Sequence, residues 1–451
     1  MKIGLEIHIQ LPTKSKMFCS CPIVSTDIAN TYVCPVCLGL PGSKPFLNKH
    51  AVELGLIIAK KLNCTIPETT WFSRKSYFYP DLCKHFQITQ YDMPIGKNGV
   101  FYFGKKPIRI TRCHLEEDPG RINRTDSGLS LVDYNRSGVP LIEIVTEPDI
   151  SSPIEAREFL STLLTEVKDA IDLDDKGLSI RCDCNISVGK ERCEVKNVTG
   201  LKNIELCLKY EAMRQTKLIK AGGRVVRETR RFDEDRKATF PSRKKEFESD
   251  YGYIGEPDLG IYHLSKIVDN IKIRESLLAR VSRFQKDYSI NELAARQIIN
   301  TSTKLADLFE ELVKVSSVDI ARPLITGTIA ANWKAFEPVM DEKSEELKSI
   351  VIDLSKGNIT DTECDLKLKM LMTGKESAEE SSLVSANLDV LVENVVKENP
   401  TVLADCLKNE KAINRIIGIV MKRTNGRYSS SDIVSTTKRV IGNMGFHSGN
   451  T

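Results

Sequence analysis

Three consecutive carboxylates, Glu116, Glu117 and Asp118, lie in the stretch TRCHLEEDPGR at residues 111–121. A histidine, His114, precedes them, and an arginine stands near each end of the stretch. Carboxylates this close repel one another unless solvent or a nearby cation relieves the repulsion. The stretch therefore fits either a solvated turn or a site that holds a metal ion.

Other polar side chains alternate with apolar ones in stretches typical of β-strands. In KIGLEIHIQL, residues 2–11, Glu6 and His8 share one face while Ile and Leu fill the other. Later strands carry two more same-face polar pairs: Glu143 with Glu147, and Asp183 with Asn185. If these strands are neighbours, their oxygen-rich faces predict a concave magnesium site. For any single carboxylate, the alternative is a solvated sheet face.

Four cysteines occur as two close pairs, Cys19 with Cys21 and Cys34 with Cys37, in the spacing C-x-C-x12-C-x2-C. Two tight turns that each offer two thiolates are typical of a tetrahedral zinc site. Four thiolates leave no open ligand position, so such a zinc site would be structural. The alternative is a set of buried free thiols.

Basic residues accompany the polar faces: Arg74, Lys75, Arg112, Lys196, Arg230 and Arg231. Magnesium together with Arg and Lys around a phosphate is the electrostatic arrangement used for phosphoryl transfer. The sequence contains no Walker A motif, no kinase glycine loop and no G-x-G-x-x-G motif. A phosphate site would therefore have to be built in another way.

The composition is that of an ordinary globular protein, since 41% of the 451 residues are hydrophobic and 28% are charged. The formal net charge is only +4, so a nucleic-acid surface would have to be local. The sequence lacks a long apolar run and the layout of a signal peptide. Together with thirteen cysteines, this predicts a reducing cytoplasm and no membrane association.

Short alternating strands broken by Gly, Pro and Asn dominate up to about residue 260. Helices are expected at residues 152–171, where Ser152 precedes Pro153, and at residues 201–219. From about residue 270 helical periodicity takes over. We predict an α+β fold with three parts: a β-rich catalytic domain at 1–268, an all-α helical domain at 269–375 and a small helical tail domain at 376–451.

Long motifs of the chain resemble the B-subunit family of the tRNA-dependent Asp/Glu amidotransferases. They include IGLEIHIQLPTKSKMF, SRKSYFYPDLCKHFQITQYDMPIG, ITRCHLEEDPGR, SLVDYNRSGVPLIEIVTEPDI, RCDCNISV, ETRRFDED and EPDL. The stretch VVKENPTVLADCLKNEKAINRIIGIVMKRTNGR resembles that family's tail domain. The resemblance covers nearly the whole chain in the right order, and it implies that the β-rich domain is shaped like a cradle.

The resemblance implies a two-step reaction. ATP and Mg²⁺ would phosphorylate the side-chain carboxylate of Glu misloaded on tRNA(Gln), or of Asp misloaded on tRNA(Asn), and ammonia would then form the amide. The ammonia would come through a channel from glutamine hydrolysed by a partner amidase A subunit, and a small C subunit would clasp the pair. This chain has no Ser-Ser-Lys amidase stretch of its own, so we expect no glutaminase activity from it alone.

The resemblance also implies the site residues. Glu6, His8, Glu116 and Glu117 would hold magnesium, with Lys75 as a further catalytic residue. Weaker candidates for contact with the nucleotide are Glu147, Asp183, Asn185, Arg230 and Arg231. The cysteine quartet corresponds to a zinc knuckle at residues 19–37 that some family members have.

A transferring phosphate is itself densely negative, so carboxylates beside it require cations that outweigh them. Arg112 and Arg121 are further candidates for that neutralisation. Asp118 is not assigned to the site, because Pro119 and Gly120 turn the chain there.

Two stretches are locally basic. Residues 214–245 contain twelve Lys and Arg against four Asp and Glu. In the tail the basic residues are Lys408, Lys411, Arg415, Lys422, Arg423, Arg427, Lys438 and Arg439. Such patches suit contact with the backbone of folded RNA, although a solvated helix face is the alternative. The assignment of tRNA binding to the tail is implied mainly by the resemblance.

Two other identities fit parts of the sequence. The archaeal E subunit shares these motifs, acts only on Glu-tRNA(Gln) and carries an additional domain before the helical region. Here EPDLGIYHL runs directly into SKIVDNIKIRESLLARV, which leaves no room for that domain. A zinc-knuckle tRNA-binding protein without catalysis would keep the cysteines and basic patches but would not need a cluster of Glu6, His8 and Glu116. The choice between Glu-tRNA and Asp-tRNA stays open.

Overall fold

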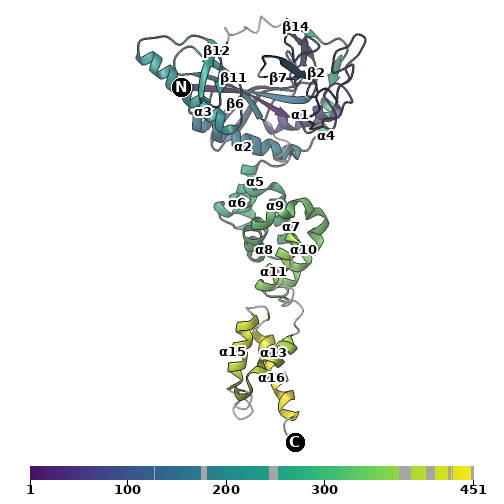
Figure 1. The fold of residues 1–451 in the computed structure, drawn as a ribbon, viewed down its shortest axis with the longest axis vertical. Helices are drawn as coiled ribbons and strands as arrows, with labels where there is room; N and C mark the ends of the chain where they lie inside the picture. The colour runs from purple at the N-terminus through teal and green to yellow at the C-terminus, as the bar shows by residue number, and fades with distance from the viewer. Residues whose placement is uncertain are drawn as a thin grey trace. The chain divides into compact units, whose positions relative to one another are not determined.

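The computed structural model describes residues 1–125, 127–173, 180–242, 252–374, 388–402, 412–424, 428 and 430–447. The chain divides into two compact units, Met1–Ser276 and Leu277–Thr451 (Figure 1). The first unit combines a large sheet with helices and the second is helical, so the predicted α+β class is confirmed. Within the described residues, no helix is both long enough and apolar enough to cross a membrane.

The first unit contains four helices and fifteen strands among its described residues. The helices are α1 (Lys49–Lys61), α2 (Pro153–Ile171), α3 (Leu201–Lys220) and α4 (Ser265–Asn270). The strands are β1 (Lys2–Gln10), β2 (Thr69–Trp71), β3 (Ser73–Ser76), β4 (Phe86–Thr89), β5 (Gly96–Phe103), β6 (Lys106–Glu117), β7 (Arg121–Arg124), β8 (Ser130–Asp133), β9 (Pro140–Thr146), β10 (Ile180–Ser187), β11 (Cys193–Thr199), β12 (Glu228–Asp233), β13 (Ala238–Pro241), β14 (Gly252–Gly255) and β15 (Ile261–His263).

Eleven of these strands form one sheet in the order β13-β12-β11-β10-β1-β9-β6-β4-β3-β14, with β5 also paired to β6. The β11–β12 pair is parallel, and the other pairs of this sheet are antiparallel. Strand β1 therefore lies at the centre, between β9 and β10, although these strands are far apart in the sequence. Two small sheets, β2–β15 and β7–β8, complete the unit.

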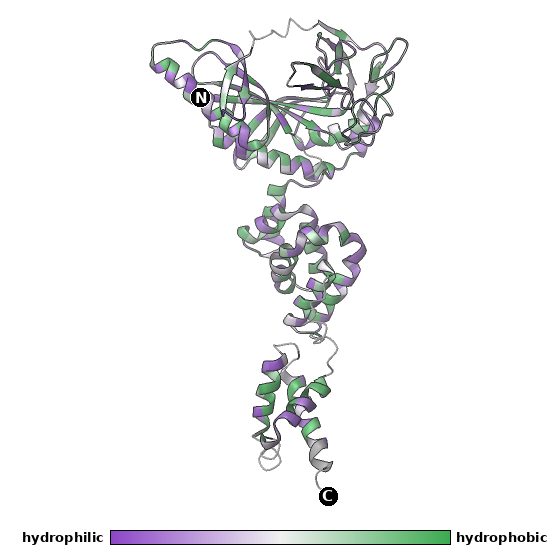
Figure 2. Cartoon of the chain, viewed as in Figure 1, coloured by the Kyte–Doolittle hydropathy of each residue, from purple (hydrophilic) through white to green (hydrophobic). Residues whose placement is uncertain are grey.

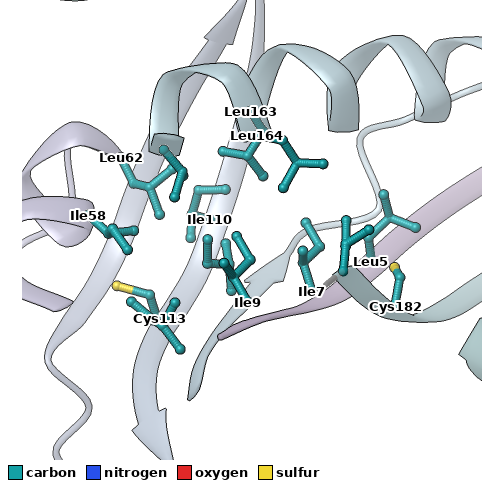
Figure 3. Close-up of a cluster of buried hydrophobic side chains, with 14 of the residues drawn as sticks. Leu5, Ile7, Ile9, Ile58, Leu62, Ile110, Cys113, Leu163, Leu164 and Cys182 are labelled. Carbon is teal, nitrogen blue, oxygen red and sulfur yellow. The ribbon is translucent and has the colours of Figure 1, made fainter. Parts of the chain in front are cut away.

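One face of the large sheet is apolar and packs against helices. Ile3, Leu5, Ile7 and Ile9 of β1 are buried there, as the sequence alternation predicted. Figure 3 shows the β1 side chains near Ile58 of α1 and Leu163 of α2, which belong to the same apolar cluster. Fully burying each aliphatic side chain contributes about 1.5–3 kcal/mol. This packing directs the alternate side chains of β1, Glu6 and His8, to the opposite face.

Capping residues position the two helices that cover this core. The predicted start of α2 is confirmed: the Ser152 hydroxyl accepts the Glu155 backbone N–H at 3.1 Å, and Pro153 occupies the first turn. The Asn48 side chain similarly accepts the Ala51 N–H at the start of α1. These caps satisfy backbone donors that would otherwise have no partner within the helix.

The first unit ends at Ser276, whereas the sequence placed the end of its domain at residue 268. The reason is that the segment after α4 is bonded to α1. Lys60 Nζ donates to the Ile271 carbonyl at 3.0 Å, and Lys61 Nζ donates to the Glu275 carbonyl at 3.0 Å. These contacts extend the unit beyond α4.

The helices of the second unit are α5 (Leu277–Tyr288), α6 (Glu292–Thr301), α7 (Thr303–Val315), α8 (Val318–Leu324), the π-helical turn η2 (Ile325–Ile329), α9 (Ala330–Phe336), the 3₁₀ turn η3 (Glu337–Val339), α10 (Met340–Ser355), α11 (Asp361–Thr373), α13 (Leu388–Glu398), α15 (Ile413–Thr424) and α16 (Ser430–His447). Many of them carry hydrophobic and hydrophilic residues together (Figure 2). The apolar residues form two clusters, one from Leu277 to Met372 and one from Leu388 to Ile441. The predicted boundary between the helical and tail domains lies next to residues 375–387, outside the described residues.

Candidate active site on the polar face of the large sheet

Strand pairing brings polar residues from four strands onto one face of the sheet. Across β1 and β10, Glu6 is paired with Asp183. Across β1 and β9, His8 is paired with Glu143, which is in turn paired with His114 of β6. Directly paired residues project to the same face with their Cβ atoms about 5 Å apart. The register therefore converts local alternation into one continuous polar surface.

His8, Glu116 and Glu143 form the first acidic cluster. The His8 Nε2 atom lies 3.3 Å from Glu143 Oε2 and 3.5 Å from Glu116 Oε1. His114 Nε2 lies 3.4 Å from the same Glu143 oxygen and 3.8 Å from Glu116 Oε2. One ligand atom each from His8, Glu116 and Glu143 lie within 4.8 Å of one another. This donor set of carboxylates and imidazole could hold a divalent cation.

Glu6, Asp183 and Glu194 form a second acidic cluster, and their ligand oxygens also lie within 4.8 Å of one another. Asn185 Nδ2 donates to Glu6 Oε1 at 2.9 Å, and the Asn197 backbone N–H donates to Asp183 Oδ1 at 2.7 Å. The buried Asn185 Oδ1 atom has no hydrogen-bond partner among the described residues. Such an oxygen is available to a cation, directly or through water.

The crowding of carboxylates shifts their proton affinities. Burial, together with the charges of Glu143, Asp183 and other acidic neighbours, raises the pKa of Glu6 to about 7. Burial and the Glu143 charge also raise the pKa of Glu116. Burial disfavours a charged His8, but Glu143 and Glu116 outweigh it and raise the pKa of His8 to about 10. In the absence of a metal ion, these shifts favour proton uptake by the crowded carboxylates and by His8, and a bound cation would supply the same neutralisation.

Both acidic clusters border one cavity of about 320 Å³. Five basic side chains line the same cavity: Lys75, Arg112, Arg192, Lys196 and Arg227. Tyr91 and Tyr253 stack on each other in its wall, with ring centroids 3.8 Å apart. Buried carboxylates for a cation beside basic groups for phosphate are the electrostatic requirements of phosphoryl transfer.

A neighbouring cavity of about 450 Å³ shares Glu6, Arg192 and Arg227 with the first one. Glu147 and Asn185 line it. The Thr111 hydroxyl donates to Glu147 Oε1 at 2.8 Å. Of the weaker predicted candidates, the structure thus brings Asn185 and Glu147 to the edge of the site, and Asp183 into its second cluster.

Glu117 does not join Glu116. Because side chains alternate along β6, Glu117 lies on the other side of the strand, where Lys84 Nζ donates to its carboxylate and the Ile88 N–H donates to it at 2.8 Å. It lines a separate cavity of about 180 Å³. The expectation that Glu116 and Glu117 bind one magnesium ion together is corrected by this alternation.

Arg230 and Arg231 also lie away from the cavity. Arg230 is buried, with Nε 3.0 Å from Glu211 Oε1 and Nη1 2.7 Å from Glu228 Oε1. Its guanidinium therefore holds β12 and β13 against α3. Arg231 is exposed and does not line the described cavities. The expectation that this pair contacts the nucleotide is corrected in favour of a structural role for Arg230.

Asp118, the last carboxylate of the acidic stretch, forms ion pairs that stabilise the fold. Asp118 is buried and lies 3.0 Å from Arg136 Nε and 3.1 Å from Arg181 Nη2. It is outside both acidic clusters. Arg112 lines the cavity, whereas Arg121 begins the small hairpin β7–β8 and does not.

Four residues of the site were not predicted from the sequence: His114, Glu194, Arg192 and Arg227. Glu143 was predicted as part of a polar strand face but not as an individual ligand. Glu143 carried a usable signal, because it lies on a strand face that the alternation of LIEIVTEPD had already identified. Glu194 alternates with Cys193 and Val195 in the same way. Arg192 and Arg227 stand just before β11 and β12, where a local sequence pattern does not reveal side-chain direction.

The four cysteines of the quartet converge. Their sulfur atoms lie within 4.8 Å of one another, and tetrahedral zinc with Zn–S bonds of about 2.3 Å places sulfurs about 3.8 Å apart. The Cys34 backbone N–H donates to Cys37 Sγ at 3.1 Å, as in a tight metal-binding turn. This donor set could hold a structural zinc ion.

The basic residues at 214–245 fall into two groups. Arg214 and Arg230 are paired with Glu211 and Glu228. Exposed positions are Lys217, Lys220, Arg224, Arg227, Arg231, Arg236 and Lys237, whereas residues 243–245 lie outside the described residues. In the tail Arg415, Lys422, Arg423, Lys438 and Arg439 are exposed, and Lys408, Lys411 and Arg427 lie outside the described residues.

Comparisons with known proteins cover both units. Residues 1–269 match the family described as the GatB/GatE catalytic domain, and residues 307–439 match the family described as the GatB domain. Relatives named as B subunits of aspartyl/glutamyl-tRNA(Asn/Gln) amidotransferase are similar along their whole length. The one from Methanospirillum hungatei is 41% identical over 97% of this chain and 98% of its own, and those from Brevibacillus brevis and Saccharolobus solfataricus are 39% and 37% identical, each over 98% of this chain and 98% and 99% of their own.

Proposed function

The chain belongs to the family of B subunits of the tRNA-dependent aspartyl/glutamyl amidotransferases, and from this premise we propose that it activates misacylated Glu-tRNA(Gln) or Asp-tRNA(Asn) with ATP. A carboxylate is a poor acyl donor until one of its oxygens becomes a good leaving group. Its attack on the terminal phosphorus of ATP forms an acyl phosphate and releases ADP. Ammonia then attacks the acyl carbon, and phosphate leaves with formation of the amide.

The observation that carries this proposal is the meeting of two acidic clusters and five basic side chains at one cavity. His8, Glu116 and Glu143 would hold one Mg²⁺ ion, and Glu6, Asp183 and Glu194 offer oxygens to a second ion or to its water ligands. Bound Mg²⁺ would supply neutralisation of the phosphate charge. The donor chemistry fits, because carboxylate oxygens and the His8 imidazole are crowded together and are groups that bind divalent cations.

The basic side chains of the cavity would bind the phosphates of ATP. Lys75, Arg112, Arg192, Lys196 and Arg227 line the cavity that the acidic clusters border. Their side chains would bind the triphosphate and orient its terminal phosphorus toward the substrate carboxylate. The repulsion between that carboxylate and the phosphates would thereby be reduced.

The relatives are named as B subunits, which supports a role within a multi-subunit enzyme. We propose that an amidase A subunit and a small C subunit complete a heterotrimer, that ammonia reaches this chain through a channel, and that the complex works in the cytoplasm. The cysteine quartet would bind a structural zinc ion. The exposed basic residues of α3, β12 and the tail would contact the tRNA backbone.

The proposal is tested in the complex reconstituted with its A and C subunits. We expect ATP cleavage that depends on misacylated tRNA, and amide formation with ammonium chloride as the nitrogen donor. Glu116→Gln and Glu6→Gln should each slow both by at least about 10²-fold, because misplacing the reacting groups by about 1 Å costs on that order. Glu158→Gln, at an exposed position of α2, should match wild type.

The same experiment distinguishes the proposed enzyme from an RNA-binding protein without catalytic activity. In that case wild-type protein would bind tRNA and cleave no ATP, or both glutamine variants would turn over at the wild-type rate. Either result would contradict the proposed phosphoryl transfer.

A further inference from the structure

Lys16 is a fully buried lysine beside the cysteine quartet. Its side chain is 0% exposed. The ammonium donates to the Tyr32 carbonyl at 2.8 Å and to the Tyr134 carbonyl at 3.5 Å, and it lies 3.6 Å from Cys37 Sγ. No ion pair between described residues links Lys16 to a carboxylate. The cysteine sulfur is therefore the contact that could carry a negative charge.

A buried ammonium is strongly unfavourable unless a negative charge lies close to it. Four neutral thiols would not provide that charge. A zinc ion bound by four thiolates carries a net charge of about −2, the sum of one divalent cation and four thiolates. An N–H donor to one of those sulfurs offsets part of this charge, as partners outside the ligand set commonly do at metal centres.

We propose that Lys16 is the electrostatic partner of a zinc–tetrathiolate centre, with its ammonium donating to the sulfur of Cys37. The buried ammonium and the negatively charged zinc centre would then each compensate part of the charge of the other. This role of Lys16 rests on the proposed zinc binding by the cysteine quartet and is independent of the phosphoryl-transfer reaction.

The backbone holds Lys16 in this place. Its N–H donates to the Cys21 carbonyl at 3.0 Å, and the next N–H, that of Met17, donates to the Gly138 carbonyl at 2.7 Å. A Cβ atom at Gly138 would lie only 3.4 Å from Lys16 Cδ, and the φ of +88° at this glycine also disfavours a side chain. The lysine stem is thus enclosed between the cysteine loops and the turn before β9.

The first test compares the zinc affinity of Lys16→Met and Lys14→Met in the full chain. Lys14 is an exposed lysine two residues away, so it controls for loss of a nearby charge. Zinc content is measured by elemental analysis, and affinity by competition with a chromogenic chelator. Lys16→Met should bind zinc about 10- to 100-fold more weakly, and Lys14→Met should match wild type. Wild-type affinity in Lys16→Met, or a wild-type chain that binds no zinc, would overturn the proposal.

A second measurement distinguishes charge compensation from simple packing. In zinc-stripped protein kept reduced, Lys16 no longer faces a centre with a net charge of about −2, so Lys16→Met should lower the melting temperature less than it does in zinc-loaded protein. In zinc-loaded protein the same substitution should lower the melting temperature. Equal losses in both states would show that Lys16 only fills space, and would end the proposal.

A third measurement needs no variant, in case Lys16→Met does not fold. A crystal structure of the zinc-loaded wild-type chain should show Lys16 Nζ within hydrogen-bond distance of a zinc-bound sulfur. An ammonium directed to solvent or paired with a carboxylate would contradict the inference.

Discussion

At the residue scale, the most informative contrast is between two neighbouring carboxylates. Glu116 lies 3.5 Å from His8 Nε2 and borders the cavity with the basic side chains. Glu117 accepts from Lys84 and from the backbone N–H of Ile88 on the other side of β6. Adjacent positions on one strand thus have different roles: Glu116 is a candidate metal ligand, whereas the charge of Glu117 is neutralised by Lys84.

Glu143 contacts both His8 and His114, and Glu143→Gln should weaken magnesium binding. A hydrogen bond or contact to a charged group contributes about 1.5–3 kcal/mol, which corresponds to about 10- to 100-fold in affinity. We expect the magnesium concentration for half-maximal ATP cleavage in the reconstituted complex to rise by that factor. The measurement is a magnesium titration at saturating ATP and tRNA.

Glu117→Gln is the matched comparison, because it removes one carboxylate charge from the same strand. It should leave the half-maximal magnesium concentration at the wild-type value while it weakens the Lys84 ion pair. A magnesium shift as large as that of Glu143→Gln would place Glu117 back in the metal site and refute the assignment made from the geometry.

At the element scale, β12 and β13 are held against α3 by a buried ionic network. Glu211 of α3 is 0% exposed and lies 2.9 Å from Arg214 Nε and 3.0 Å from Arg230 Nε. The Thr239 hydroxyl of β13 also donates to it. Because Thr229 and Arg227 of this segment line the cavity, the network positions one wall of the site.

Glu211→Gln should destabilise the first unit by about 3–5 kcal/mol at pH 7, since it removes the fully buried carboxylate that pairs with Arg214 and Arg230. Burial opposes ionisation of Glu211, but the hydrogen bonds from Arg214 and Thr239 outweigh it and lower its pKa. Its contribution is therefore complete above the ordinary value of 4.5 and is lost as the pH falls through the lowered pKa. The difference from wild type should shrink below pH 4.5 in urea denaturation experiments.

Hydrogen exchange of the α3 peptides would assign that change to the first unit. Glu205→Gln removes the partly exposed ion pairs that this α3 residue makes with Arg157 of α2 and Lys209 of α3, and it should have a much smaller effect. Equal effects of the two substitutions, or a Glu211 effect that grows as the pH falls, would disprove the role given to the network.

At the scale of the whole molecule, charge is distributed unevenly. The net charge is only +4, yet exposed basic residues gather on α3, in the segments around β12, and on α15 and α16. The tail has its own apolar cluster from Leu388 to Ile441, separate from that of the preceding helices. Because the tail has an apolar cluster of its own, it is a candidate for a separate RNA-binding module.

A chain that ends at Gly374, assembled with its partner subunits, should bind misacylated tRNA at least about tenfold more weakly at physiological salt. Each lost phosphate contact should reduce the slope of log Kd against log salt by about 0.7–0.9. The measurement is a series of binding curves at several KCl concentrations. Unchanged affinity and slope would show that the tail does not contact the RNA backbone.

The properties that depend on near neighbours along the chain could be deduced from the amino-acid order alone. These are the apolar and polar faces of β1 and β10, the start of α2 at Ser152, the change to helices after the β-rich part, and the pairing of cysteines within the quartet. Alternation and capping are set over a few residues, so they can be deduced without knowing the fold. The resemblance to the family's motifs also singled out Glu6, His8 and Glu116 as candidate magnesium ligands.

The three-dimensional fold was needed to establish which faces meet. Glu6 and Asp183, or His8 and Glu143, are far apart in the sequence and become neighbours through the register of β1 with β10 and β9. A shift of one residue in either pairing would direct the partner to the other face, and local patterns do not specify that register. The same reason explains the separation of Glu117 from Glu116, the structural use of Arg230 and the burial of Lys16 beside Cys37.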